Sequence, residues 1–162
     1  MTCAIMLATL TASAQKGEMA VGGSLNFGIL TGRTDIGLMG KYQYNILDQL
    51  RAEASVGYYF KKDYVTQLEA NVNLHYLFNL GQGGWKIYPL AGLAWYQQSW
   101  DYPTGYGYGI IEESDSKSWF GLNLGVGVEY PITEKLKIAG EFRHQILDGS
   151  REVISLGLNY TL

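Results

Sequence analysis

The two histidines of this 162-residue sequence, His75 and His144, are the residues whose type first suggests acid–base or metal chemistry. His144 ends the run Glu141-Phe142-Arg143-His144. A histidine that is held by an acid can activate a serine for attack on an ester. The nearest following serine, Ser150, comes six residues later, where we expect a turn. His144 is therefore a candidate catalytic residue without an evident nucleophile, and the alternative is an interfacial histidine with no catalytic role.

The sequence has no spacing typical of a metal or cofactor site. His75 shares a polar strand face with Asn71 and Asn73, and no HxH or HExxH pattern includes it. The one cysteine, Cys3, lies in a segment that we expect to be removed. We therefore predict no metal site and no cofactor, and we expect His75 to be a hydrogen-bonded interior histidine.

The first 14 residues have the features of an export signal. Residues 2–10 form an apolar run, and Ala12-Ser13-Ala14 is a small-x-small pattern of the kind that a signal peptidase cuts. We predict a signal peptide over residues 1–14 and one barrel domain over residues 15–162.

From Met19 onward the hydrophobic pattern has a period of two, which predicts strands rather than helices. In the segment 50–61, for example, Leu50, Ala52 and Ala54 alternate with Arg51, Glu53 and Ser55. Segment 85–98 is too apolar for its faces to be assigned. The expected strands cover residues 21–29, 36–46, 50–61, 64–78, 85–98, 120–130, 136–146 and from about 153 to 162.

The connections between these strands alternate between short gaps and longer ones, with the longest over residues 99–117. An antiparallel meander produces this alternation. Strands of about 10 to 15 residues exceed the roughly 9 to 11 that cross a bilayer at a tilt, and an even number of strands closes without edges. The fold class predicted is all-β, an eight-stranded antiparallel up-and-down transmembrane β-barrel.

Alternation alone leaves open which face points outward, because a soluble lipocalin-like barrel would place the apolar faces inside, around a lipid ligand. Several apolar faces end in aromatic residues, such as Phe60, Phe78 and Tyr130, as expected of girdles at bilayer interfaces. The opposite faces combine glycine and serine with charges that can pair in a narrow interior. These features favour the membrane barrel. A net charge of −3 without a Lys/Arg cluster argues against nucleic acid as a partner.

Seven charged residues fall on the polar strand faces, and we expect them to form a network in the barrel lumen. Their pairing could be purely structural, since buried charges need partners, or it could line a gated polar path. The residues are Arg51, Glu53, Glu69, Glu129, Lys137, Glu141 and Arg143.

The long connection 99–117 carries aromatic residues interleaved with glycine and proline, followed by acidic residues. Tyrosine and glycine supply rigid contact area and an adaptable backbone in recognition loops. The residues expected to contact a surface partner are Trp100, Tyr102, Tyr106 and Tyr108. The alternative is that the first two extend the aromatic girdle.

The alternating strands, the segment Tyr88-Pro89-Leu90-Ala91-Gly92-Leu93, the glycine-spaced strand 121–130 and the C-terminal run 156–162 resemble small outer-membrane barrels of the OmpA/OmpX type. The sequence is most similar to short "porin family" barrel proteins of Gram-negative bacteria. This resemblance implies a monomer in the cell outer membrane that contacts lipid and lipopolysaccharide. It also implies recognition of the C-terminal strand by the barrel-assembly machinery, although Leu162 replaces the usual terminal phenylalanine.

The stretch that ends in His144 also resembles the surroundings of the catalytic histidine in outer-membrane lipid A deacylases. In that family a serine follows two residues after the histidine, whereas this chain has Ile146 there. We therefore expect a structural or surface-interaction role without catalysis. A hydrolase that uses His144, a minor channel and a soluble lipid-binding barrel are the alternatives.

Overall fold

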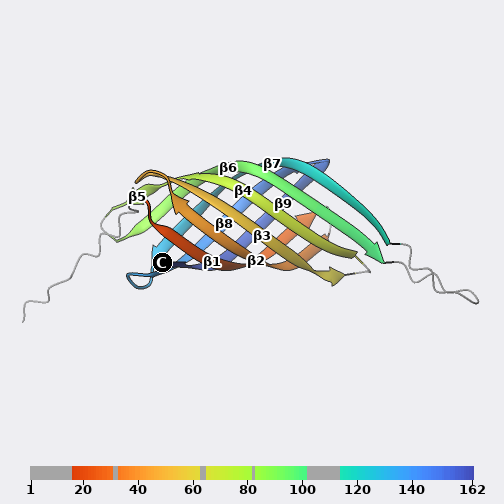
Figure 1. Cartoon of the computed structure of the whole chain (residues 1–162), viewed down its shortest axis with the longest axis horizontal. Coiled ribbons are helices and arrows are strands. Elements are labelled where there is room, and N and C mark those ends of the chain that lie inside the picture. The colour runs from red at the N-terminus through yellow and green to blue at the C-terminus, as the bar shows by residue number, and fades with distance from the viewer. Residues whose placement is uncertain (1–15, 31–32, 63–64, 82, 102–113) are drawn as a thin grey trace, which may run out of the picture.

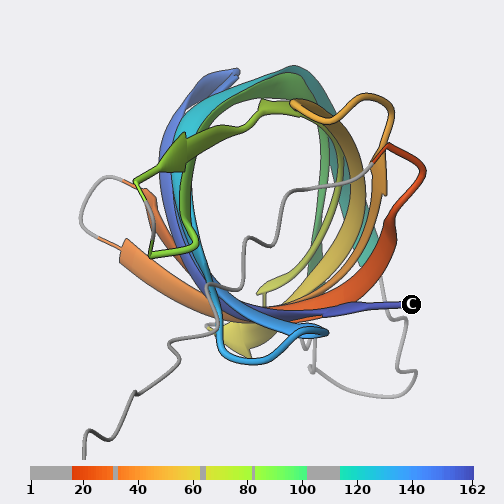
Figure 2. The ribbon, with the colours of Figure 1, turned by 90° about the vertical axis from the view of Figure 1, so that its left-hand side faces the viewer.

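The computed structural model describes residues 16–30, 33–62, 65–81, 83–101 and 114–162. Their strands are β1 (Met19–Leu30), β2 (Arg33–Asn45), β3 (Leu50–Lys62), β4 (Val65–Tyr76), β5 (Phe78–Leu80), β6 (Trp85–Asp101), β7 (Ser114–Pro131), β8 (Leu136–Leu147) and β9 (Gly149–Thr161). All the pairings are antiparallel, and the pairs β1–β9 and β4–β6 close the sheet into a barrel (Figures 1 and 2).

Although nine strands are numbered, the barrel wall is eight strands around, because β5 continues β4. Both strands pair with β6, and they are separated only at Leu77, whose N–H donates to the carbonyl of Gln49 instead of to the sheet. The Leu77 side chain turns inward and packs with Tyr88 and Leu90 in the apolar cluster of the interior. The predicted eight-stranded meander is therefore confirmed. Among the described residues, no helix is long and apolar enough to cross a membrane.

The apolar strand faces point outward and the polar faces point inward. Val56, Val72 and Leu93 expose more than 60% of their surface, whereas Glu53, Glu69 and Arg143 expose 1% or less. An exposed apolar band around a polar interior is the arrangement of a membrane barrel. It contradicts the soluble lipocalin-like alternative, which requires the apolar faces to enclose a ligand.

The structure also assigns the faces of β6, which the sequence left open. Lys86, Tyr88 and Tyr96 are buried inside, whereas Ile87 and Leu93 are exposed outside. The segment is largely apolar in pattern because, after Lys86, its inward positions include tyrosine, leucine and alanine rather than charges.

Several strand boundaries differ from the expected ones, and those of β6, β7 and β9 affect possible sites. β9 begins at Gly149, so Ser150 belongs to a strand and not to a turn. β6 and β7 contain 17 and 18 residues, longer than their neighbours of 12 or 13. Figure 1 shows these two strands running past the ends of β8 and β9. We call this end of the barrel the loop end, and we call the opposite end, where both described chain ends lie, the terminal end.

Glycines on the inward face leave space for large side chains that cross the lumen. A Cβ placed on Gly127 would come within 2.6 Å of the Tyr88 ring carbons and hydroxyl. The Tyr88 side chain is fully buried in that space. In contrast, a Cβ on Gly40, which points outward, would have no heavy atom within 4 Å.

We expect Gly127→Ala to destabilise the barrel by about 1–3 kcal/mol, because the added methyl group must displace the Tyr88 ring in a filled interior. The urea concentration at which the fast-migrating, unboiled form disappears on a denaturing gel measures this change. Gly40→Ala is the matched control and should leave the transition unchanged. Equal behaviour of the two variants would contradict the close contact.

Candidate functional site

The lumen contains six buried cationic side chains and five buried carboxylates among the described residues. They are Lys41, Arg51, Lys86, Lys137, Arg143 and Arg151, together with Asp35, Glu53, Glu69, Glu129 and Glu141. A dry, narrow interior tolerates such charges only where they are paired. All seven residues that we expected in the network lie there, and most of their contacts form three clusters along the barrel.

The cluster nearest the terminal end is centred on Glu129. Arg51 places Nη1 at 2.8 Å from Oε2 of Glu129, and Lys86 places Nζ at 4.0 Å from the other carboxylate oxygen. Lys137 forms a separate pair with Glu18, with 2.6 Å between Nζ and Oε1. Because two cations share Glu129, this cluster carries an excess of positive charge.

The central cluster instead has an excess of negative charge, because two carboxylates share the ammonium group of Lys41. Its Nζ lies 2.7 Å from Oε2 of Glu141 and 3.8 Å from Oε1 of Glu53. The Tyr88 hydroxyl donates to the other oxygen of Glu141 at 2.9 Å. His75 stacks on Tyr88 with 4.7 Å between ring centroids and 13° between the planes.

The loop-end cluster gathers two arginines around Glu69. Arg143 and Arg151 place Nη1 atoms at 3.5 Å and 3.4 Å from its two carboxylate oxygens. Tyr59 and Gln145 donate to the same carboxylate, each at 2.9 Å. Along the barrel the three clusters are therefore cation-rich, carboxylate-rich and cation-rich in turn. Neighbouring clusters have opposite net charge and attract one another.

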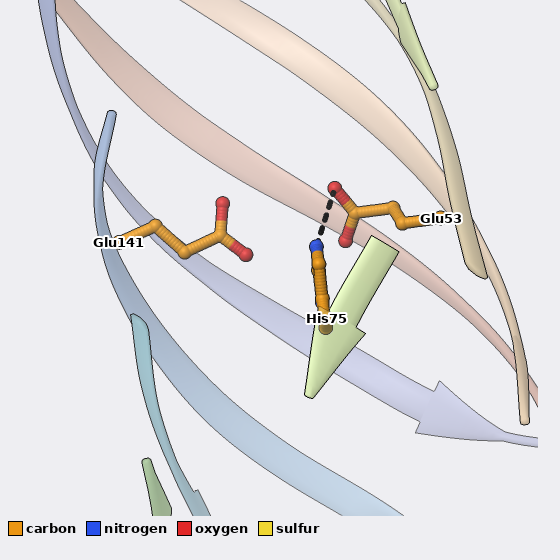
Figure 3. A group of neighbouring side chains, drawn as sticks. All are labelled: Glu53, His75 and Glu141. Atoms are coloured by element: carbon orange, nitrogen blue, oxygen red, sulfur yellow. Dashed lines mark ion pairs between the residues drawn. The ribbon is translucent and has the colours of Figure 1, made fainter. Parts of the chain in front are cut away.

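The central cluster also contains the one group of described residues whose donor atoms suit a metal ion. Single ligand atoms of Glu53, His75 and Glu141 lie within 4.8 Å of one another (Figure 3). The sequence showed no such group because its members come from three separate strands.

This group already belongs to a hydrogen-bonded network that includes a cation, the ammonium of Lys41. The Lys41 ammonium binds Glu141 and lies beside Glu53. Arg51 donates through Nε to Nδ1 of His75 at 3.3 Å, which leaves the proton of a neutral imidazole on Nε2. That nitrogen faces Oε1 of Glu53 at 4.0 Å, so a hydrogen rather than a lone pair points at the carboxylate. The geometry therefore favours a proton and an ammonium group over a metal ion.

His144 lies on the outward face of β8, close to the loop end. Its Nδ1 is 2.6 Å from Oε1 of Glu152, the residue opposite it on β9, and both side chains are 38% exposed. Ser150 is paired with Ile146 in the same ladder, which makes it a diagonal neighbour of His144 on that face. The register brings Glu152 to the histidine, and among the described residues no hydrogen bond joins His144 to Ser150.

Of the expected recognition residues, the structure describes Trp100, which lies on the inward face of β6, 6.5 Å from Trp119 between ring centroids. Tyr102, Tyr106 and Tyr108 lie outside the described residues. The sequence reasoning missed Trp119 and Tyr96 as inward-facing residues of this end. A sustained alternation through residues 114–119 would have been the signal, but serine and charged residues interrupt the apolar pattern there.

Lumen residues that the sequence reasoning left out of the network include Lys41, Tyr59, Tyr88 and Arg151. Lys41 and Tyr59 already stood on expected polar faces, and a rule that every such position is interior would have found them. Arg151 precedes the expected start of the last strand, and Tyr88 belongs to the segment without assignable faces.

The family model of the outer membrane protein beta-barrel domain matches residues 1–161, and the chain belongs to this family. The protein is accordingly an integral outer-membrane barrel. No curated protein matches the chain.

Solved outer-membrane barrels share the fold at low sequence identity. The N-terminal β-barrel domain of Pseudomonas aeruginosa OprF is 20% identical, with a TM-score of 0.66 over 91% of this chain and 100% of that one. Ail, the attachment invasion locus protein of Yersinia pestis, is 16% identical, with a TM-score of 0.63 over 91% and 100% of the two chains. OprG of Pseudomonas aeruginosa is 12% identical, with a TM-score of 0.65 over 94% and 99%. These similarities establish the architecture.

We expect Lys41→Met to destabilise the barrel by about 3–5 kcal/mol, because it leaves two buried carboxylates without their shared cation. The double variant Lys41→Met/Glu141→Gln should recover part of this loss, since it also removes one of the two charges. Lys135→Met, at an exposed lysine above the Tyr160 ring, is the control. Urea titration of the folded, fast-migrating form measures all three, and a Lys41→Met transition equal to that of the control would contradict the assigned pairing.

Proposed function

We propose that this protein is a non-catalytic, monomeric outer-membrane barrel whose β6–β7 extension faces the cell exterior and contacts partners there. The observation that carries this proposal is the unequal length of the strands. Residues 114–121 of β7 pair with β6 but have no partner on β8, whose ladder with β7 begins at Leu122 and Ile146. Such a projection adds nothing to barrel closure, so a surface role accounts for it better than a structural one.

The packing of the lumen supports a non-conducting barrel. Arg143, Glu69 and His75 are all at 0% exposure and cross an interior that eight strands make only wide enough for side chains. A gated path would have to break several buried ion pairs at once. Structural pairing is therefore the preferred role of the seven predicted lumen residues.

The remaining partners follow from the outer surface and the chain end. The exposed apolar band contacts membrane lipid, and its loop-end part meets lipopolysaccharide. Strand β9 ends the barrel with outward-facing Leu158 and Tyr160, and it is the segment that the barrel-assembly machinery would read. In this orientation the first and last described residues, Lys16 and Leu162, lie on the periplasmic side.

Single-cysteine labelling of intact cells tests the orientation. With Cys3 replaced by serine, Ser116→Cys should react with a membrane-impermeant maleimide, because its side chain is exposed on the extension. Glu134→Cys, in the turn between β7 and β8 at the terminal end, is the matched control and should react only after the outer membrane is permeabilised. Labelling of Glu134→Cys but not Ser116→Cys in intact cells would overturn the proposal.

A second candidate function, hydrolysis of a lipid ester, has one observation in its favour, the contact between His144 and Glu152 on the outer wall. The missing part is a nucleophile held by the histidine, because His144 contacts Glu152 and no hydrogen bond joins it to Ser150 in the described part of the chain. The pair is better explained as a polar contact at the membrane interface.

We expect His144→Ala to leave the acylation of lipid A unchanged in cells that produce the protein, as measured by mass spectrometry of extracted lipid A. Cells with the unaltered protein and cells without it should also give the same acyl pattern. Loss of an acyl chain that depends on both His144 and Ser150 would instead establish the hydrolase.

A further inference from the structure

At the loop end, the inward faces of β4, β6 and β7 carry alternating rows of polar and aromatic side chains. The register places Gln67, Gln98 and Lys117 side by side in one row across the three strands. Tyr96 and Trp119 are paired in the row nearer the barrel centre, and Trp100 stands in the row nearer the loop end. We call these six residues the inner panel.

The aromatic members of the inner panel contact one another but are not sealed. The Tyr96 and Trp119 centroids are 5.8 Å apart, and Trp100 meets Trp119 edge to face at 6.5 Å. Trp100 and Trp119 remain half-buried, whereas Tyr96 is buried with 8% of its surface exposed. A core cluster would enclose such rings completely, whereas here both indoles keep part of their surface exposed and the Nζ of Lys117 lies 5.2 Å from the Trp119 ring centroid.

Two buried polar side chains, Gln67 in the panel and Arg151 in contact with it, each keep one atom without a hydrogen-bond partner. Gln67 donates through Nε2 to Asp35 at 3.0 Å, yet its Oε1 accepts no hydrogen bond, although the residue is only 4% exposed. Arg151, 3% exposed, stacks on Tyr59 and Tyr96 and likewise has a buried Nη2 without an acceptor. Both atoms are inaccessible to solvent, so the polar groups that a ligand can reach in the panel are the half-buried amide of Gln98 and the exposed ammonium of Lys117.

We infer that the inner panel binds a neutral oligosaccharide that enters the barrel mouth from solution. The apolar face of a pyranose ring packs on indole rings, while its hydroxyl groups both donate and accept hydrogen bonds. Here the indoles of Trp100 and Trp119 flank the row that holds Gln98, whose amide offers both functions.

The position of the panel identifies the source of the sugar. The residue next to Trp119, Phe120, points to the opposite side of the sheet and is 80% exposed on the lipid face. Lipopolysaccharide of the same leaflet meets that outer face, whereas the panel faces the barrel axis. The inference rests on the proposed function, because a soluble saccharide reaches the panel only if the loop end is outside the cell.

The test uses the mature chain, folded in lauryldimethylamine oxide micelles, because maltoside detergents would themselves present sugars. Maltohexaose and hexa-N-acetylchitohexaose are the probes, and binding is followed by isothermal titration calorimetry. We expect saturable binding of at least one probe. Trp119→Ala should weaken it by about 10-fold or more, and Gln98→Ala by about 3–10-fold.

Trp95→Ala is the matched control, because Trp95 is on the same strand as Tyr96 but on the opposite, outward face, paired with Phe120. It should bind the probe as the unaltered protein does. Each variant is first checked for the fast-migrating folded form, and Gln98→Ala decides the outcome if Trp119→Ala does not fold.

Failure of both probes to bind saturably, or an equal loss in Trp95→Ala, would overturn the inference. Labelling of Ser116→Cys from outside together with such a failure would refute the sugar site alone and leave the proposed surface role intact. Absence of that labelling would refute the surface role whatever the titration gave.

Discussion

Pairing of buried charge is the constraint on which the rest of this barrel depends. Eight strands enclose a lumen only wide enough for side chains, and the outward face is given over to lipid. Most of the charged side chains of the strands must therefore share a dry interior. Lys41, held between Glu53 and Glu141, meets that constraint at the centre, where a single ammonium balances two carboxylates and the clusters on either side are rich in cations.

The same constraint explains where the aromatic residues and glycines of the lumen lie. Tyr88 reaches Glu141 with its hydroxyl and supports His75 with its ring, and it fits because Gly127 on the neighbouring strand has no side chain. The central cluster thus combines ligand atoms suited to a metal ion with a hydrogen-bond pattern that already supplies a cation. A group of potential ligand atoms does not by itself define a metal site when a lysine ammonium already balances the charge of its carboxylates.

At the loop end the requirement for pairing relaxes, because β6 and β7 leave the barrel wall. Trp100 and Trp119 there are neither core residues nor part of the lipid-facing girdle, although they continue the inward face of the lumen. The closed, charge-paired interior and the aromatic mouth divide the molecule into a part that maintains the barrel and a part available for recognition.

The alternation of residues such as Leu50, Arg51, Ala52 and Glu53 was sufficient to predict the strands and the meander, because a strand's period of two is local. The inward direction of the charged side chains needed a second signal, the aromatic residues that end the apolar faces. Tertiary structure alone decided which charges meet. Lys41 and Glu141 are 100 residues apart, and strand tilt and register determine their relative height in the barrel. The same holds for β6, where a largely apolar composition hides the inward Tyr88 and Tyr96, and for Ser150, which only the pairing of β9 with β8 places in a strand.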